Sequence, residues 1–452
     1  MKINRPIIKV IEMNLLRIKD NSQQNKELFS NIEKLTDKIA DKTLKQLECE
    51  GIFVFPEIIR DADDITQDQT ILQSVNNDYR SGNVMGFLGS GDERLIIESR
   101  FCKNGDDYFF QYLLDNVLDL PNIVNLESDA DQTDRLFNFL LFLFPHYLKT
   151  AMRKGVFKTY IRYKYNDENI KGTIDVARHI SKNTPFTGNI AYSQREFSYD
   201  NPLTELIRHT IEFIKKKPFG NHLLFKVKDE VNLILASTPR YELCDRQKII
   251  EQNKKYIIHH AYFKEYLSLQ RLCILILQHQ KHRIGSGSQR VFGILFDGAW
   301  LWEEYVNTLA NEIFYHPLNK ARKGAQRLFN NNTAGLIYPD FISRDKENRI
   351  IADAKYKPIK NIGNHDYLQL LAYMFRFDAS VGYFLYPETE NSDDLKLWMN
   401  CGSTYESNVR PRNDISITKH GLKIPLDALS YSDFSEKMKL REQEFIQVFF
   451  NC

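Results

Sequence analysis

Residues 335–358 read GLIYPDFISRDKENRIIADAKYKP, and this segment predicts a β-hairpin with charges near its apolar strands. A polar turn at residues 344–349 separates the apolar lead-in from the returning strand. Side chains alternate between the two faces of a strand, so Asp353 and Lys355 stand on one face. Because the turn folds the first strand back, it can bring Asp340 beside Asp353. The segment therefore predicts two carboxylates and one ammonium group that converge.

Such a group of side chains suits a divalent cation that assists phosphodiester hydrolysis. Mg²⁺ binds a few protein carboxylates and keeps several waters. A lysine can orient or deprotonate a water and offset the charge that builds on the phosphorus centre. The alternative is an exposed cross-strand ion pair, which would contribute only about 0.2–1 kcal/mol. A second Asp-x-Lys, Asp394-Leu395-Lys396, lacks a preceding Pro-Asp and is expected in a solvated loop.

An amphipathic helix is expected upstream, because apolar residues recur every fourth position from Leu301 to Ile313. Glu303 lies at the edge of this apolar stripe and is predicted to reach the hairpin as a third acidic ligand. Glu304 is assigned to the polar surface. The alternative places both glutamates on that surface.

A second helix is expected downstream, where residues 366–377 read DYLQLLAYMFRF. Gln369 and Tyr373 are four residues apart and face the same way. They can hydrogen-bond a phosphate or the surroundings of Lys355, or they can belong to an ordinary helix surface. The apolar stripe is expected from Leu368, Leu371, Ala372 and Phe375. A buried strand follows at residues 381–387.

These motifs together resemble a known superfamily. Glu303, Pro339-Asp340, Asp353-Ala354-Lys355 and the Gln369/Tyr373 pair resemble the PD-(D/E)xK nucleases in their RecB-like form. More narrowly, LWEEYV at residues 301–306 and ADAKYK at 352–357 resemble McrC, the endonuclease subunit of McrBC-type modification-dependent restriction systems. IKGTID at 170–175 and YDNPLT at 199–204 resemble the middle region of such subunits.

The resemblance implies a fold class and a set of residue roles. The fold class is α/β, α+β overall, with a C-terminal mixed-sheet domain like that of restriction endonucleases. The implied activity is cleavage of double-stranded DNA, including modified DNA, with Mg²⁺ as cofactor or Mn²⁺ as its substitute. The implied metal ligands are Glu303, Asp340 and Asp353. Lys355 would handle the attacking water, and Gln369 with Tyr373 would position that lysine or the DNA backbone.

The resemblance also implies a partner, an AAA+ ring similar to McrB that hydrolyses GTP or ATP. In that family the N-terminal and middle parts of the nuclease subunit dock on the ring and stimulate its hydrolysis. This chain itself is expected to bind no nucleotide. Its glycine-rich run at residues 84–91 continues with Asp92 instead of Lys-Ser/Thr, and an acid there would repel phosphate. A hairpin turn is predicted for this run.

Three segments are predicted along the chain. Residues 1–100 form an N-terminal α+β domain, 101–288 a mainly helical middle domain, and 289–452 the nuclease domain. The boundary follows the flexible composition at residues 285–289. A β insertion in the middle domain carries Lys158, Arg162 and Lys164 among tyrosines, which fits a DNA or protein contact or a solvated strand face. A first strand is expected at residues 7–11.

A basic run lies between the Glu303 helix and the Asp340 strand. It is predicted to hold the phosphates that flank the scissile bond, although ordinary surface loops have the same composition. Its cations are Lys320, Arg322, Lys323 and Arg327.

The composition of the chain limits which classes of protein it can belong to. The net charge is +2 in 452 residues, so any grip on DNA must come from a local patch. Six cysteines without CxxC spacing indicate reduced thiols and neither a zinc site nor a disulfide framework. No signal peptide is evident, and the apolar run at 137–144 is too short to cross a membrane. We expect a soluble cytoplasmic protein.

Two other classes of function remain open on the sequence. The chain can be a non-catalytic adaptor that keeps the nuclease fold only to activate the motor, although an intact set of two acids and a lysine speaks against this. It can also be a free-standing nuclease of the RecB-like repair or transposon type, which would cleave DNA without nucleotide or partner.

Overall fold

The computed structural model describes residues 14–50, 52–55, 70–102, 107–117, 132–282, 291–317, 324–330, 335–390, 392–402 and 409–450. The chain forms two compact units. Unit 1 contains residues Met1–Ser128 and Gly287–Cys452, and unit 2 contains Asp129–Ser286. This division differs from the three predicted segments, because a strand that follows residue 290 completes the N-terminal sheet. The strand predicted at residues 7–11 lies outside the described residues.

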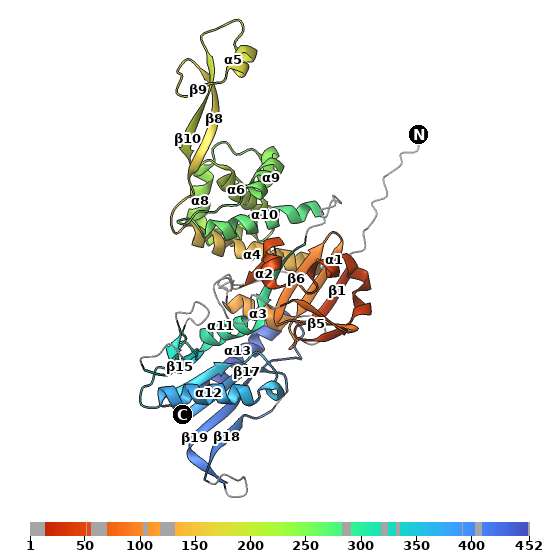
Figure 1. The fold of residues 1–452 in the computed structure, drawn as a ribbon, viewed down its shortest axis with the longest axis vertical. Helices are drawn as coiled ribbons and strands as arrows, with labels where there is room; N and C mark the ends of the chain where they lie inside the picture. The colour runs from red at the N-terminus through yellow and green to blue at the C-terminus, as the bar shows by residue number, and fades with distance from the viewer. Residues whose placement is uncertain are drawn as a thin grey trace. The chain divides into compact units, whose positions relative to one another are not determined.

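The N-terminal sheet of unit 1 has the order β1-β7-β6-β11-β3 (Figure 1). Its strands are Asn14–Lys19 (β1), Glu93–Glu98 (β7), Val84–Ser90 (β6), Phe292–Asp297 (β11) and Ile52–Phe55 (β3). A smaller sheet and short helices adjoin it: β2 (Gln23–Asn25), β5 (Asp78–Ser81), β4 (Leu72–Val75), η1 (Lys26–Ile32), α1 (Glu33–Ile39) and α2 (Leu44–Glu50). All side chains of β6 and β7 are buried, so these central strands are covered on both faces.

The glycine-rich run is mostly strand, so the predicted hairpin turn is wrong for residues 84–90. Only Gly91, with φ +60°, belongs to the turn into β7. Gly86 explains the composition, because a Cβ atom there would come within 2.1 Å of the carbonyl oxygen of Ile294 on β11. Glycine permits this close approach of two backbones and the φ of +141°.

The second sheet of unit 1 has the order β12-β15-β16-β17-β19-β18. Its strands are Phe314–Tyr315 (β12), Phe341–Ser343 (β15), Ile350–Ala354 (β16), Val381–Glu388 (β17), Val409–Lys423 (β19) and Leu395–Gly402 (β18). The pairs β16–β17 and β17–β19 are parallel and the other pairs are antiparallel. A two-stranded sheet, β13 (Gln326–Arg327) with β14 (Leu336–Ile337), lies in the same unit.

Helices cover both faces of the second sheet. They are α3 (Tyr108–Val117), α11 (Gly298–Ala310), α12 (Asn364–Phe377) and α13 (Tyr431–Gln447), with η6 (Ile359–Asn361) and η8 (Val448–Phe450). Neighbouring residues of a strand point to opposite faces. Phe384 accordingly packs on Tyr367 of α12, whereas Tyr383 packs on Phe449 beside α13. The observed mixture of helices and mixed sheets confirms the predicted α/β class.

Unit 2 is mainly helical and carries a β arm, as its sequence predicts. Its helices are α4 (Gln132–Met152), α5 (Val176–Lys182), α6 (Pro202–Lys215), α7 (Gly220–Phe225), α8 (Lys228–Ser237), η4 (Leu243–Asp245), α9 (Arg246–Lys255) and α10 (Tyr266–His282). The arm consists of β8 (Thr159–Asp167), β10 (Ile190–Ser198) and β9 (Thr173–Ile174). Asn201 caps α6 in a capping box with Thr204, which fixes where the arm ends and the helices resume.

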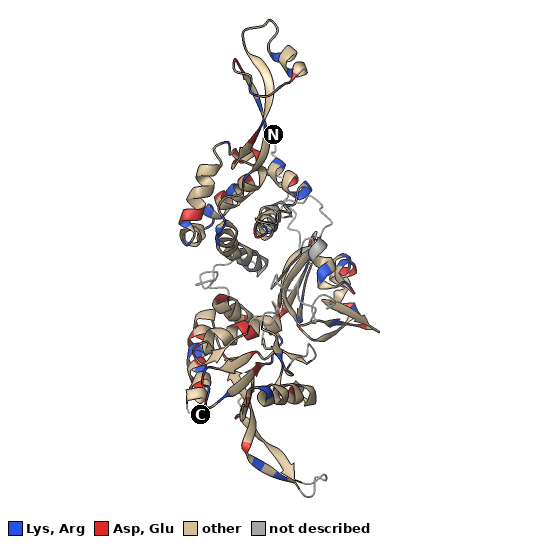
Figure 2. Cartoon of the chain, turned by 60° about the vertical axis from the view of Figure 1, so that its left-hand side comes forward, with Lys and Arg blue, Asp and Glu red and all other residues tan. Residues whose placement is uncertain are grey.

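The exposed face of the arm carries Arg162 and Lys164 on β8 and Arg195 on β10. Figure 2 colours the lysine and arginine positions of the arm blue. Arg162 on β8 lies opposite Arg195 on β10, and Tyr160 lies opposite Phe197. The guanidinium of Arg195 lies 4.9 Å from the ring centre of Tyr160. A contact of this face with DNA or with a protein stays a prediction, and a solvated strand face is its alternative.

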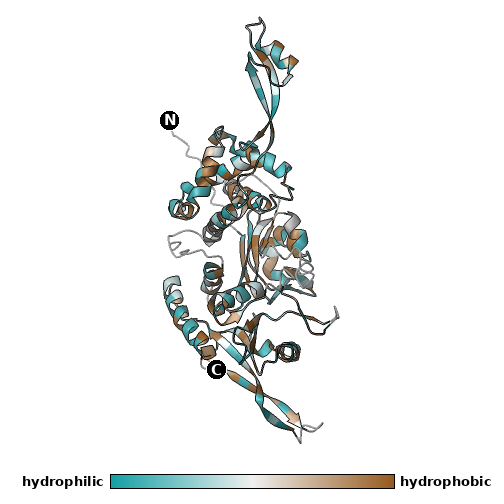
Figure 3. Ribbon diagram, turned by 90° about the vertical axis from the view of Figure 1, so that its left-hand side faces the viewer, coloured by the Kyte–Doolittle hydropathy of each residue, from teal (hydrophilic) through white to brown (hydrophobic). Residues whose placement is uncertain are grey.

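The far end of the arm exposes apolar side chains. Figure 3 colours part of α5 as hydrophobic. Val176, Ile180 and Phe186 are exposed there. Cys102 and Cys273 are buried, Cys401 is half-buried and Cys244 is exposed. No helix in the described part of the chain is both long and apolar enough to cross a membrane.

Candidate metal and catalytic site

The hairpin β15–β16 brings Asp340 to Asp353. Phe341 pairs with Ala352 and Ile342 with Ile351, so Asp340, which directly precedes β15, comes opposite Asp353. The backbone amide of Ala354 donates a hydrogen bond to Asp340 Oδ2 at 2.9 Å. The approach of the two acids thus follows from the strand register, as the hairpin pattern predicts.

Lys355 closes the same site. Its amide donates to the carbonyl oxygen of Leu385 on β17 at 2.8 Å, which extends the sheet pairing past the end of β16. Its Nζ lies 2.5 Å from Asp353 Oδ2 and donates to Gln369 Oε1 at 3.2 Å. Asp366 Oδ1 lies farther away, at 3.7 Å. The ammonium group therefore lies between the strand and the first turns of α12.

The Gln369/Tyr373 pair lies on the inner face of α12. Gln369 Nε2 donates to the Tyr373 hydroxyl at 2.7 Å, and Tyr373 is only 3 % exposed. An ordinary helix surface is therefore excluded for Tyr373. The predicted apolar stripe is wrong for Leu368 and Phe375, which are 69 % and 87 % exposed, whereas its member Leu371 packs against the core beside the buried Leu370 and Met374. The helix carries apolar residues on more than one face, and packing against β16 and β17 selects one of them.

The two aspartates are held in an unfavourable environment for negative charge. Burial, with the nearby charge of Asp340, raises the pKa of Asp353 to about 7. Burial and the charge of Glu303 raise the pKa of Asp340 to about 6. For Lys355, burial alone would lower the pKa, but Asp353 and Asp340 outweigh it and raise the pKa. The two carboxylates therefore favour the protonated form of Lys355 in this arrangement.

Glu303 lies on helix α11. Its N-terminus is capped by Asp297, which accepts from the amides of Ala299 at 2.8 Å and Trp300 at 3.2 Å. Trp302 is fully buried, and its Nε1 donates to the carbonyl oxygen of Leu385 at 3.0 Å. This bond fixes the rotation of the helix, and Glu303 follows as the next residue.

His316 is a site residue that the sequence pattern does not reveal. Its Nδ1 lies 2.9 Å from the carbonyl oxygen of Asp340, and its ring stacks on Phe341. Its Nε2 lies 3.6 Å from Glu303 Oε1 and 3.7 Å from Glu304 Oε1. Burial lowers the pKa of His316, but Glu304, the Asp340 carbonyl and Glu303 outweigh this and raise it to about 9. Glu304, assigned to the surface from the sequence, thus interacts with a buried cation.

The oxygen donors fit a hard divalent cation. Asp353 Oδ2 is buried, and the Lys355 ammonium lies 2.5 Å from it. Burial nevertheless raises the pKa values of Asp353 and Asp340, so the ionised form of each carboxylate is disfavoured. A bound divalent cation would offset this cost of keeping two carboxylates ionised. Among the described residues, only Glu242, Cys244 and Asp245 in unit 2 have three ligand atoms within 4.8 Å of one another. Glu303, Asp340 and Asp353 are not all drawn together that closely.

The other sequence-predicted residues are placed as follows. Lys320, Arg322 and Lys323 lie outside the described residues. Arg327 is exposed on β13, and its carbonyl oxygen accepts from Arg376 Nε at 2.7 Å. Asp394 of the second Asp-x-Lys bonds to His420 Nδ1 at 2.7 Å, and Lys396 is exposed on β18 instead of in a loop.

Comparison with protein families gives a match over most of the chain. The family described as "McrBC 5-methylcytosine restriction system component" matches residues 79–387. No curated protein matches the chain significantly.

Two solved structures are similar over much of the chain, at low identity. One is a refined half-complex from a tetradecameric assembly of Thermococcus gammatolerans McrB AAA+ hexamers with bound McrC. It is 15 % identical, covers 94 % of this chain and 99 % of that chain, and gives a TM-score of 0.46. The other is a Thermococcus gammatolerans McrBC complex, 15 % identical, covering 68 % of this chain and 90 % of that one, with a TM-score of 0.33. Both scores are too low to support a conclusion alone.

Proposed function

Because this chain belongs to the family of McrBC 5-methylcytosine restriction system components, we propose that it is the DNA-cleaving subunit of such a system. The observation that carries the proposal is the convergence of the half-buried Asp340, Lys355 and Gln369 on the buried Asp353 at the end of one sheet. Carboxylates whose pKa values are shifted by burial and by a specific charged partner cluster at functional sites, which supports this choice.

We assign a role in this reaction to each side chain of the site. Asp340 and Asp353 would hold Mg²⁺, or Mn²⁺ in its place, with Glu303 as a third ligand. When bound, the cation lowers the pKa of a coordinated water and stabilises charge at the phosphorus centre. Lys355 keeps its proton, orients the attacking water and offsets charge on the phosphate. Gln369 accepts from Lys355 and donates to Tyr373, so this pair sets the direction of the ammonium group.

The substrate that we propose is double-stranded DNA containing 5-methylcytosine. Support comes from the description of the family. Cleavage of a methylated duplex, compared with the same duplex without methylation, tests this choice. Equal cleavage of both would remove methylation from the proposal.

Two variants test the nuclease site itself. We expect Asp353→Asn and Lys355→Ala each to lower the cleavage rate about a hundredfold or more, because each removes a group that acts on the reacting atoms. The second Asp-x-Lys supplies matched controls: Asp394→Asn and Lys396→Ala should cleave like the unmodified chain. Undiminished cutting by either site variant would show that the chemistry lies elsewhere or that the chain is an adaptor.

We propose an AAA+ GTPase or ATPase, similar to McrB, as the partner. The apolar end of the arm in unit 2 supports a protein contact, since exposed apolar clusters of this kind mark interaction sites. Mixing the purified chain with such an ATPase should cause co-elution and faster nucleotide hydrolysis. Cleavage without nucleotide or partner would instead favour a free-standing nuclease.

A further inference from the structure

Tyr356, the residue after Lys355, leaves the nuclease sheet and enters the N-terminal half of unit 1. It is 4 % exposed. Its hydroxyl lies 2.8 Å from Ser99 Oγ, just beyond β7, and 3.2 Å from Met85 Sδ on β6. Two sheets that are distant in sequence therefore meet at the neighbour of the site lysine.

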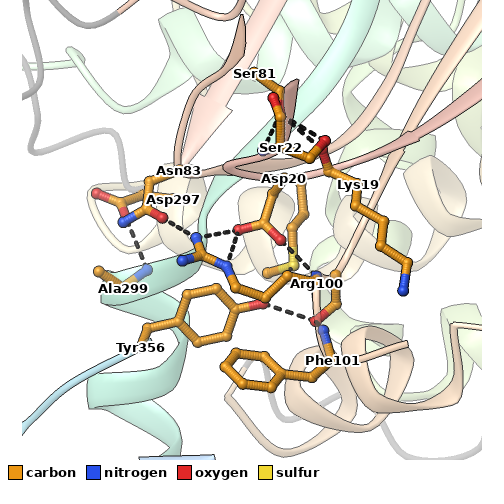
Figure 4. A network of polar contacts seen from close by, with 12 residues as sticks. Lys19, Asp20, Ser22, Ser81, Asn83, Arg100, Phe101, Asp297, Ala299 and Tyr356 are labelled. Carbon is orange, nitrogen blue, oxygen red and sulfur yellow. Dashed lines mark hydrogen bonds and ion pairs between the residues drawn. The ribbon is translucent and has the colours of Figure 1, made fainter. Parts of the chain in front are cut away.

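The ring of Tyr356, like its hydroxyl, contacts residues next to β7 (Figure 4). The guanidinium of Arg100 lies 4.9 Å from the ring centre, and Phe101 meets the ring edge-on at 5.1 Å. Arg100 is itself fixed, because its Nε donates to the fully buried Asp20 at 2.9 Å and its guanidinium also bonds to Asn83. The tyrosine thus packs against a rigid, charge-paired loop.

The same ring also touches the start of the helix that carries Glu303. A Cβ atom at Gly298, the first residue of α11, would come within 2.7 Å of Tyr356 Cε1. Glycine is therefore required for the ring to lie against this helix. The strand β11 of the N-terminal sheet runs directly into α11. Glu303 and Lys355 are consequently both tied to the N-terminal sheet, one through the backbone and the other through Tyr356.

From these contacts we propose that Tyr356 is a positioning residue, which holds Lys355 at Asp353 by anchoring the chain to Ser99 and Arg100. Lys355 and Tyr356 are adjacent, so fixing the tyrosine restricts the backbone from which the lysine side chain extends. Lys355 in turn has little freedom, because its amide is bonded to Leu385 and its Nζ to Gln369. This inference rests on the proposed function for its catalytic consequence, but the coupling itself can be measured without cleavage.

The experiment compares the unmodified full chain with three single variants and also uses the Tyr356→Phe/Ser99→Ala double variant. Tyr356→Phe and Ser99→Ala each remove one side of the 2.8 Å hydroxyl contact while keeping the packing. Tyr112→Phe is the matched control, because it removes a similarly buried hydroxyl that donates to Glu442 Oε1 at 2.7 Å, away from Lys355. One readout is the rate at which acetic anhydride labels Lys355, followed by mass spectrometry with the exposed Lys346 as internal reference. The other is the cleavage rate at saturating DNA, measured with the partner present.

We expect Lys355 to be labelled about threefold faster or more in Tyr356→Phe and Ser99→Ala, and unchanged in Tyr112→Phe. The cleavage rate should fall about tenfold in the first two variants, with unchanged DNA affinity, and the double variant should lose no more than either single one. Equal labelling of Lys355 in all four proteins, or losses that add in the double variant, would overturn the inference. Faster labelling in a chain that never cleaves DNA would uphold the positioning role and overturn the proposed function.

Discussion

The backbone amide of Lys355 and the indole of Trp302 donate to the same carbonyl oxygen, that of Leu385, at 2.8 Å and 3.0 Å. This shared acceptor joins α11, the helix that carries Glu303, to the end of β16. Because Trp302 is fully buried, the two elements cannot shift separately without breaking a buried hydrogen bond. The acid and the lysine are thereby kept in a fixed relation.

Trp302→Phe should therefore destabilise the protein and slow cleavage. The lost hydrogen bond and the cavity left by the smaller ring should lower the free energy of unfolding by about 1–3 kcal/mol. The cleavage rate should fall several-fold. Chemical denaturation and a cleavage assay measure both effects. Trp398→Phe on the exposed part of β18 is the control and should change stability by less than about 0.5 kcal/mol. Equal effects of the two changes would contradict the shared-acceptor argument.

His316→Gln should shift the acidic limb of the cleavage profile to higher pH. The charge of His316, whose pKa is about 9, lowers the pKa of Asp340. Without that charge, Asp340 holds its proton to higher pH, so a more alkaline solution is needed for its ionised form. Activity at pH 7 should drop several-fold and recover in part at pH 8.5. His365→Gln, at an exposed position of α12, should leave the profile in place.

Divalent cations should stabilise the protein in a pH-dependent way. At pH 8, millimolar Mn²⁺ should raise the melting temperature by several degrees, since both aspartates are ionised and can bind it. Below pH 5.5 the effect should vanish, because the pKa values of Asp353 and Asp340 are about 7 and about 6. Asp353→Asn should abolish the shift, whereas Asp345→Asn in the exposed turn should keep it. A shift that is independent of pH would place the cation elsewhere.

Without metal, Asp353→Asn should make the protein more stable at neutral and alkaline pH. The folded-state pKa of Asp353, about 7, lies above the ordinary value of 3.8, so the folded protein binds the proton more tightly than the unfolded chain. Stability therefore falls as pH rises from about 4 through 7. Asparagine removes that pH-dependent penalty, so the stability of the variant relative to the unmodified chain should be roughly 1–3 kcal/mol higher at pH 8 than at pH 4. Denaturation at pH 4 should show no such gain, and a gain of equal size there would refute the assignment.

Polar replacements at the end of the arm should weaken the partner contact. Phe186 and Ile180 are 64 % and 60 % exposed, so Phe186→Ser and Ile180→Ser should leave the melting temperature nearly unchanged. If the partner covers these side chains, stimulation of its nucleotide hydrolysis should drop about tenfold or more. Phe225→Ser is the control in the same unit, because Phe225 is 71 % exposed on α7. A similar drop in the control would point to a non-specific effect.

The sequence by itself determined the local part of the site. Alternation along β16 and the turn at residues 344–349 fix the register that brings Asp340 to Asp353, and the i,i+4 spacing joins Gln369 to Tyr373. These relations span few residues, and the periods of strand and helix dictate them directly. The helical middle segment and its β insertion can also be predicted from the sequence, since each helix or strand has its own hydrophobic period.

Only the tertiary structure decided which surfaces meet. The sequence of α12 allows more than one apolar face, and contact with the sheet buries Leu370 and Met374 while Phe375 stays exposed. His316 joins the acids through packing on Phe341, and no spacing rule marks it. Tyr356 and Ser99 are 257 residues apart, and β11 completes a sheet begun by the N-terminal strands. Such pairings depend on the shapes of two surfaces folded against each other, and a local period carries no information about the second surface.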